Sequence, residues 1–145
     1  MEILDQKRCD DAIVVALGSN MAGAWGAPGE MLERGITALG DCGLIVSARS
    51  RQWRSKAWPD PAGADYRNAV CLVETALEPV ALLNLLHRIE QEAGRARMEV
   101  NGPRTLDLDL IAYGRRISAR TPILPHPRAS ERLFVMGPLA EILPN

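Results

Sequence analysis

Apolar residues follow two different spacings along the chain, and these spacings predict alternating strands and helices. A continuous apolar run at 12–17 ends at Gly18-Ser19-Asn20, which is typical of a buried strand followed by a turn. Residues 28–39 begin with a proline and then place apolar side chains three and four positions apart. Pro79 opens a second stretch of this kind, which stops at Gly94. Both stretches predict amphipathic helices.

Three further stretches predict strands. Residues 44–53 alternate between apolar and polar positions, residues 66–77 form a second β-rich run, and a last strand ends at Tyr113-Gly114. The order of elements is therefore β-α-β-β-α-β. This order predicts an α+β, ferredoxin-like fold, in which an antiparallel sheet carries both helices on one face.

The C-terminal tail has a different composition. Five prolines fall in the 31 residues after Gly114, which predicts a loop-rich extension with one or two short helices. Apolar residues between 133 and 142 would be exposed unless the tail folds back over the sheet. The chain has 145 residues, so we expect one domain at 12–145 after a flexible N-terminal segment at 1–11.

The composition argues against several classes of protein. Apolar residues make up 47% of the chain, which suits a globular protein, and no apolar run approaches the ~20 residues of a membrane span. Residues 1–11 are charged and lack the pattern of a secretory signal. The three cysteines are scattered, which argues against a disulfide framework and a thiolate metal site. We therefore expect a cytoplasmic protein that does not bind membranes.

Charge is unevenly distributed along the chain. Residues 1–94 carry nine basic and thirteen acidic side chains, a balance of −4, whereas residues 95–132 carry eight arginines and four acidic side chains, a balance of +4. Arginine matches phosphate oxygens bidentately, so this excess points to a polyphosphate ligand. It is too small and too mixed in sign to indicate nucleic-acid binding.

Asp107 and Asp109 are the strongest candidate for chemistry. Residues two apart in a strand point to the same face, so these carboxylates project together while Leu106, Leu108 and Leu110 face a core. Two carboxylates on one face of a buried element repel unless cations neutralise them, and Mg²⁺ with phosphate oxygens is suited to that task. The alternative is an edge strand with two solvated aspartates.

Basic residues surround this pair in the sequence. Arg95 and Arg97 follow the second helix and Arg104 precedes the aspartates. Metal ions and guanidinium groups could therefore lie on opposite sides of a phosphate group, as phosphoryl-type transfer needs. Each arginine alone could equally be a solvated surface charge. His126 is held between two prolines, which suits contact with a phosphate, although such a histidine is often structural. Glu90, on the second helix, could be a surface residue or accept a hydrogen bond from a ligand.

Three residues could recognise a planar heterocycle. Tyr66 and Asn68 share one strand face, and an aromatic beside an amide offers stacking together with a donor–acceptor edge. Phe134, the single phenylalanine, could supply the opposite wall. The alternative for each is an ordinary role in the core or in a turn.

Four motifs, read together, resemble a known family. They are Ala16-Leu17-Gly18-Ser19-Asn20, Gly94-Arg95-Ala96-Arg97, Gly102-Pro103-Arg104-Thr105-Leu106-Asp107-Leu108-Asp109, and Leu124-Pro125-His126-Pro127-Arg128 with Arg132 and Phe134. In this order they are similar to the 6-hydroxymethyl-7,8-dihydropterin pyrophosphokinases of folate biosynthesis. The similarity covers about residues 12–143.

The resemblance implies an ATP-dependent diphosphokinase. It would move the diphosphate of ATP to 6-hydroxymethyl-7,8-dihydropterin and release AMP, with two Mg²⁺ ions. The roles that the resemblance implies are metal binding for Asp107 and Asp109, catalysis for these two together with Arg95 and Arg104, ATP binding for Glu90, Arg95, Arg97, Arg104, His126 and Arg132, and pterin binding for Ser55, Tyr66, Asn68 and Phe134.

Two loops depart from the best-known members of this family. Val100-Asn101 stands where those members have Arg-Trp, and Ser55-Lys56-Ala57-Trp58-Pro59 replaces their Thr-x-Pro element. Two other functions stay open, namely a non-catalytic ferredoxin-like ligand-binding module and a metal-dependent phosphohydrolase. We expect a monomer, with a dimer as the alternative.

Overall fold

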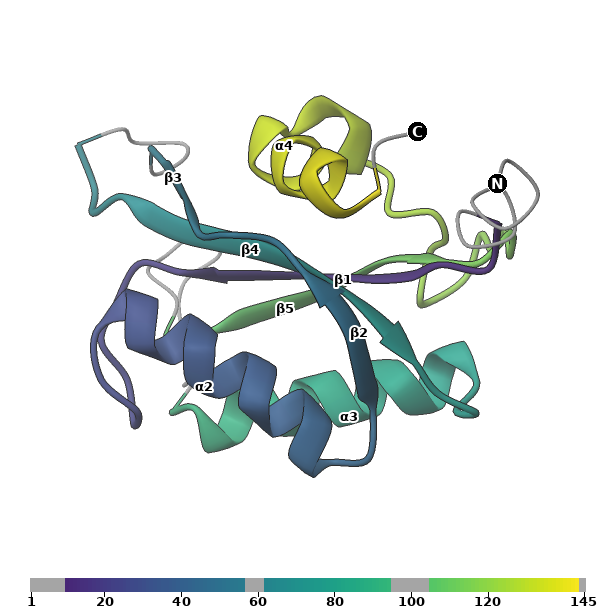
Figure 1. The fold of residues 1–145 in the computed structure, drawn as a ribbon, viewed down its shortest axis with the longest axis horizontal. Helices are drawn as coiled ribbons and strands as arrows, with labels where there is room; N and C mark the ends of the chain where they lie inside the picture. The colour runs from purple at the N-terminus through teal and green to yellow at the C-terminus, as the bar shows by residue number, and fades with distance from the viewer. Residues whose placement is uncertain (1–9, 57–61, 95–104, 144–145) are drawn as a thin grey trace.

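A computed structural model of the protein describes residues 10–56, 62–94 and 105–143. Figure 1 shows a sheet with helices on both of its faces. In chain order, the described elements are β1 (Ile13–Ser19), α2 (Pro28–Asp41), β2 (Ile45–Arg49), β3 (Trp53–Ser55), β4 (Tyr66–Glu74), α3 (Pro79–Glu92), β5 (Asp107–Tyr113), the short 3-10 helix η1 (Ala129–Glu131) and α4 (Leu133–Ile142).

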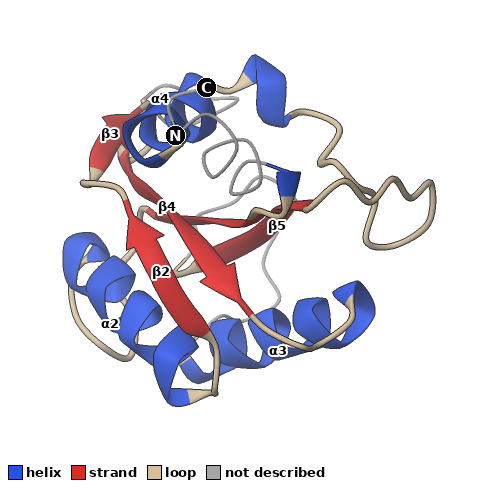
Figure 2. Ribbon diagram, turned by 45° about the vertical axis from the view of Figure 1, so that its right-hand side comes forward, coloured by secondary structure: helices blue, strands red, loops and turns tan. Residues whose placement is uncertain are grey.

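The sheet has the strand order β2-β4-β1-β5, with β3 also paired to β4, and every pairing is antiparallel. Helices α2 and α3 cover one face, and α4 lies on the opposite face (Figures 1 and 2). The predicted α+β fold, with two helices on one side of an antiparallel sheet, is confirmed. The expectation that the tail folds back over the sheet is confirmed as well.

The predicted strand at 44–53 is the main difference, because the structure divides it into β2 and β3. Ser50 lies between them, and its hydroxyl oxygen accepts a hydrogen bond from the Val70 amide at 2.9 Å. The same hydroxyl donates to the carbonyl of Arg51. A side chain thus replaces a backbone partner at this point, which ends one strand before the next begins. Strand β4 is also shorter than predicted, since it ends at Glu74.

Two hydrophobic clusters hold the layers together. The larger lies between the sheet and α2 and α3, and it includes the fully buried Leu32, Leu39 and Leu86. The smaller lies under α4, where Val135 packs against strand residues such as Val70. Alternate strand residues supply the two clusters, as the period of two in a strand requires. No helix in the described ranges combines the length and apolar character that a membrane span needs.

Strand β5 contains one extra residue. Val15 of β1 is opposite Leu110, but the neighbouring Val14 is opposite Ala112, so Ile111 bulges out of the register. Ile111 packs into the cluster under α4, and its carbonyl accepts a hydrogen bond from the His126 amide at 2.8 Å. The bulge therefore ties the strand that carries the aspartates to the tail.

Candidate active site

Asp107 and Asp109 leave the sheet on the α4 side. In the register, Asp107 is opposite Gly18 and Asp109 is opposite Ala16, which belongs to the cluster under α4. Both aspartates are half-buried, whereas the intervening Leu108 is 2% exposed and packs on the helix side. The two carboxylates therefore share one face and are about 6.5–7 Å apart along the strand.

Gly18 forms a bare position beside this pair. It is opposite Asp107 on one side and opposite Asn68 on the other. A Cβ atom at Gly18 would lie 3.4 Å from Oδ1 of Asn68 and 3.6 Å from Cδ1 of Tyr66. Asn68 and Tyr66 thus approach the backbone of β1 closely, at the position that is opposite Asp107.

The amide of Asn68 is held in place. Its Nδ2 donates to Oγ of Ser55 at 2.9 Å, and Asn68 is 3% exposed. Ser55 and Tyr66 are opposite each other in the β3–β4 pairing. The structure therefore brings Ser55, Tyr66 and Asn68 together on the same face as the aspartates.

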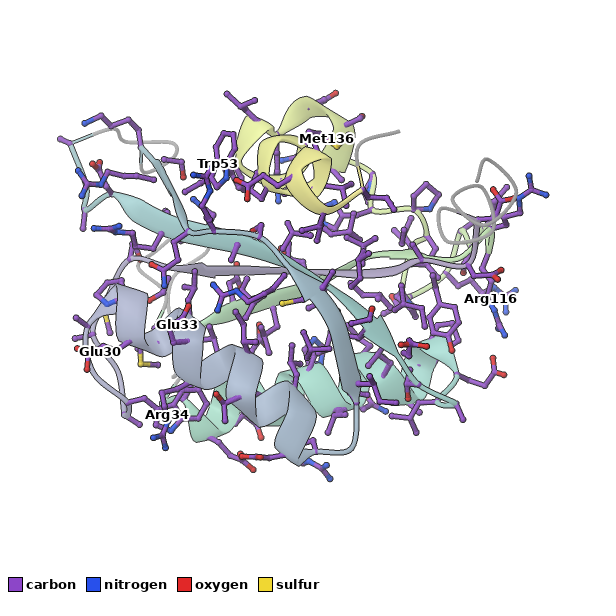
Figure 3. All side chains as sticks on the ribbon, viewed as in Figure 1. Glu30, Glu33, Arg34, Trp53, Arg116 and Met136 are labelled. Atoms are coloured by element: carbon purple, nitrogen blue, oxygen red, sulfur yellow. The ribbon has the colours of Figure 1, made fainter. Side chains whose placement is uncertain are left out.

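Helix α4 adds an aromatic group and a cation to this face. Phe134 is half-buried and packs against the cluster under α4, and the Arg132 guanidinium lies over its ring, 5.7 Å from the centroid. Figure 3 shows Trp53 beside α4, and its indole donates a hydrogen bond to Glu141 of that helix. This hydrogen bond fixes the C-terminal end of α4 over β3, where Trp53 is opposite Asn68.

His126 lies where β5 meets the tail. Burial lowers the pKa of its imidazole, and the positive charges of Arg132 and Arg128 lower that pKa further. Its Nδ1 accepts a hydrogen bond from the Arg128 amide at 3.2 Å. A neutral imidazole can donate a hydrogen bond to an anionic ligand, while the two nearby guanidinium groups supply the positive charge.

Glu90 lies on the other side of the sheet, on α3. It is 3% exposed, and its Oε2 accepts a hydrogen bond from the Leu108 amide at 2.7 Å. The alternative that Glu90 is a surface residue is therefore wrong. A contact between Glu90 and ATP stays a prediction.

Arg95, Arg97 and Arg104 lie outside the described residues, as do Val100-Asn101 and residues 57–61. Among the described residues, no group of three or more His, Cys, Asp or Glu side chains could hold a metal ion. Two carboxylates alone are nevertheless a suitable donor set for Mg²⁺, which commonly takes one or two carboxylates and completes its octahedron with water and phosphate oxygens. Asp107 and Asp109 therefore fit a metal that is bound together with a nucleotide.

A cavity of about 700 Å³ lies away from the aspartates, at the start of α2. Glu30, Glu33 and Arg34 line it from α2, which lies across the sheet from α4 (Figure 3). Its carboxylates already have partners, since Glu33 pairs with Arg49 at 2.7 Å and Glu30 accepts from the Ala27 amide. Of the site residues predicted from the sequence, none lines this cavity.

Sequence reasoning missed two residues that shape the α4 face. Gly18 was assigned to a turn, but it belongs to β1, where Asn68 and Tyr66 lie close to it. Trp53 was placed at the end of a strand, without the contact to α4 that its indole makes. A glycine inside an otherwise apolar strand is the signal that could have identified Gly18 as a close approach. No comparable signal pointed to Trp53, because its partners are about 85 residues away in the chain.

Comparison with known proteins gives consistent matches. A family model described as 7,8-dihydro-6-hydroxymethylpterin-pyrophosphokinase (HPPK) matches residues 14–144. A Synechocystis protein named 2-amino-4-hydroxy-6-hydroxymethyldihydropteridine pyrophosphokinase is 40% identical over 144 residues, which cover 96% of this chain and 69% of that protein. A Haemophilus influenzae protein of the same name is 39% identical over 140 residues, which cover 90% of this chain and 84% of that protein.

A larger relative also matches. The Pneumocystis carinii "Folic acid synthesis protein fol1" is 37% identical over 134 residues. The match covers 92% of this chain but only 18% of that protein. The similarity is thus to one part of a much longer polypeptide.

Proposed function

The chain belongs to the 7,8-dihydro-6-hydroxymethylpterin-pyrophosphokinase family, and we propose that the α4 face of its sheet carries out the diphosphate transfer. The chain is a pyrophosphokinase of folate synthesis. It transfers the diphosphate of ATP to 6-hydroxymethyl-7,8-dihydropterin and releases AMP. The observation that carries the assignment of the site is the shared face of Asp107, Asp109 and Asn68.

Asp107 and Asp109 would hold Mg²⁺, and we propose two ions. The metal, when bound, neutralises charge on the phosphate oxygens and orients them for in-line displacement. The task of the two carboxylates is to fix these charges at one end of β5, beside the bare position at Gly18. A half-buried location strengthens the attraction between carboxylate and cation relative to water.

The pterin would lie between aromatic groups. Tyr66 from β4 and Phe134 from α4 offer two rings on the same face of the sheet, which supports a stacked arrangement. Asn68 would hydrogen-bond the edge of the heterocycle, and Ser55 would hold that amide in one orientation. The lack of a side chain at Gly18 would let the heterocycle approach the backbone and bring its hydroxymethyl group toward Asp107.

The ATP phosphates would meet basic residues from several segments. We propose that Arg95 and Arg104 neutralise the charge that develops during transfer, and that Arg97 and Arg132 contribute further positive charge to the nucleotide site. His126 would contact a phosphate as a neutral donor, since its neighbours hold its pKa below the ordinary value. Glu90 completes the set of residues that the family resemblance assigns to ATP.

Substitution of each aspartate tests the site. Asp107→Asn and Asp109→Asn should lower Mg²⁺-dependent turnover by orders of magnitude while leaving the circular dichroism spectrum unchanged. Asp41→Asn, at the end of α2 on the other face, is the matched control and should keep its activity. Near-normal turnover in either site variant would show that the metal is bound elsewhere.

Measurement of AMP separates this function from the two alternatives. A pyrophosphokinase forms AMP only when the pterin is present, a phosphohydrolase forms AMP or ADP without it, and a binding module forms neither. We propose that the protein acts as a monomer in the cytoplasm, with a dimer as the alternative, and that it binds neither nucleic acid nor membranes. Sedimentation velocity at several protein concentrations tests the oligomeric state.

A further inference from the structure

Strand β5 lies at one end of the described sheet order, so only one of its edges pairs with another described strand, β1. In an antiparallel pair, alternate amide groups of such a strand point away from its neighbour. Leu108 is one of these residues, and it lies between Asp107 and Asp109. Its outward N–H therefore needs a partner from outside the sheet.

Glu90 supplies that partner from the helix layer. Helix α3 packs on β5 from the face opposite to α4 (Figure 1). The Glu90 side chain reaches the strand, and its Oε2 accepts from the Leu108 amide at 2.7 Å. Glu90 is 3% exposed and Leu108 is 2% exposed, so both ends of this hydrogen bond are shielded from water.

A buried carboxylate at this point needs a structural reason, because removing a charged group from water is costly unless hydrogen bonds compensate for it. The neighbouring α3 residues Leu86 and Ile89 are 0% and 1% exposed, so the helix face around Glu90 is apolar. A hydrogen bond from an amide to an ionised carboxylate is shorter and stronger than a neutral one. The contact therefore gives the Leu108 amide an acceptor inside an otherwise apolar layer.

The position of the contact connects it to the metal site. The Leu108 nitrogen belongs to the peptide unit that begins at the carbonyl of Asp107. Fixing that peptide plane fixes the direction in which the Asp107 side chain leaves the strand, and it limits the twist between Asp107 and Asp109. A small error in such a direction is enough to displace a metal ligand.

We propose that Glu90 is a positioning residue for the metal-binding aspartates: its buried carboxylate anchors β5 at Leu108 and keeps Asp107 and Asp109 directed toward Mg²⁺. This inference rests on the proposed roles of the two aspartates. It differs from the direct contact with ATP that the family resemblance implies for Glu90, because the carboxylate acts through the backbone of β5. The two roles predict different responses to substitution.

Two variants test the inference. Glu90→Gln keeps an oxygen that can accept from the Leu108 amide, whereas Glu90→Met has a similar length and no acceptor of comparable strength. Leu39→Ala, in the core beneath α2, is the control for a general loss of stability. Each protein is titrated with Mn²⁺ in the presence of a non-hydrolysable ATP analogue by electron paramagnetic resonance, and amide hydrogen exchange at Leu108 is followed by NMR.

The positioning role predicts a specific pattern. Glu90→Met should weaken Mn²⁺ binding at least tenfold and speed exchange at Leu108 at least a hundredfold, whereas Glu90→Gln should stay within threefold of the wild type in Mn²⁺ binding. Leu39→Ala should leave Mn²⁺ binding unchanged. In steady-state assays, the apparent Mg²⁺ requirement of Glu90→Met should rise more than its KM for ATP.

Three results would overturn the inference. Unchanged Mn²⁺ binding in Glu90→Met with a raised KM for ATP would assign Glu90 to direct nucleotide contact. Equal losses of Mn²⁺ affinity in Leu39→Ala and Glu90→Met would show that the effect comes from a general loss of stability. Rapid exchange of the Leu108 amide in the wild-type protein would show that this amide is not held by a hydrogen bond to Glu90. This test needs no variant. If Asp107→Asn and Asp109→Asn also bind Mn²⁺ normally, the proposed metal site fails, which is a separate outcome.

Discussion

Gly137 offers a test of how α4 is attached to the sheet. A Cβ atom at this position would lie 2.6 Å from Cη2 and Cζ3 of Trp53, closer than side chains can approach. The indole cannot simply move away, because its nitrogen donates to Glu141, four residues further along the same helix. Gly137→Ala must therefore break this hydrogen bond or push α4 away from β3.

The expected magnitude follows from two opposing effects. Replacing glycine by alanine inside a helix usually stabilises a protein by about 0.5–1 kcal/mol. Overpacking at a fixed contact costs about 1–3 kcal/mol. We therefore expect Gly137→Ala to lower the free energy of unfolding by up to about 2 kcal/mol instead of raising it. The matched control is Gly40→Ala in α2, where a Cβ atom would meet nothing within 4 Å and the ordinary gain should appear.

Urea denaturation of both variants measures the difference. We expect the two free energies of unfolding to differ by about 1–3 kcal/mol, with Gly40→Ala above the wild type. Because Phe134 lies one turn before Gly137, the KM for the pterin should also rise in Gly137→Ala, while the Mg²⁺ requirement stays the same. Equal stabilisation by the two substitutions would refute the tight contact between Trp53 and α4.

Four further predictions concern buried or half-buried polar groups. Burial raises the pKa of the Cys71 thiol to about 12, so Cys71 should resist iodoacetamide at pH 8 under conditions that alkylate the exposed Cys42; equal labelling rates by mass spectrometry would contradict this. The pKa of His126 is lowered from 6.5, so the imidazole binds a proton less readily in the folded protein than in the unfolded chain. The free energy of unfolding should therefore fall as the pH drops below about 6.5. His126→Gln should flatten that dependence, and an NMR titration that gives a pKa above 6.5 would contradict it. Thr105 has a buried hydroxyl without a hydrogen-bond partner in the described part of the chain, so Thr105→Val should change the free energy of unfolding by less than about 1 kcal/mol. Ser50→Ala removes a buried hydroxyl with two partners and should cost about 1–3 kcal/mol in the same urea denaturation.

Much of the fold could be predicted from local patterns. The prolines that open α2 and α3, the glycines after these two helices and the period of two at Asp107 and Asp109 are properties of short segments, so the sequence contains them directly. The fold-back of the tail followed from its apolar residues, because exposing them would be unfavourable.

The remaining features depend on contacts between distant segments. The bulge at Ile111 appears only when β5 is aligned with β1, and nothing in the apolar run around it marks the extra residue. The burial of Glu90 depends on how α3 packs against β5, so its sequence position left open whether Glu90 lies on the surface. Trp53 and Gly137 are far apart in the chain, and their contact requires the tail to be placed first.

The extra residue in β5 also bears on how this protein could change length during evolution. Loss of Ile111 would let Ala112 follow Leu110 in regular alternation, so both carboxylates would keep their side of the sheet. The same deletion would remove the carbonyl that receives the His126 amide. A variant that lacks this residue would thus still fold but leave the imidazole untethered, and selection would act on the contact with the nucleotide that we propose for His126.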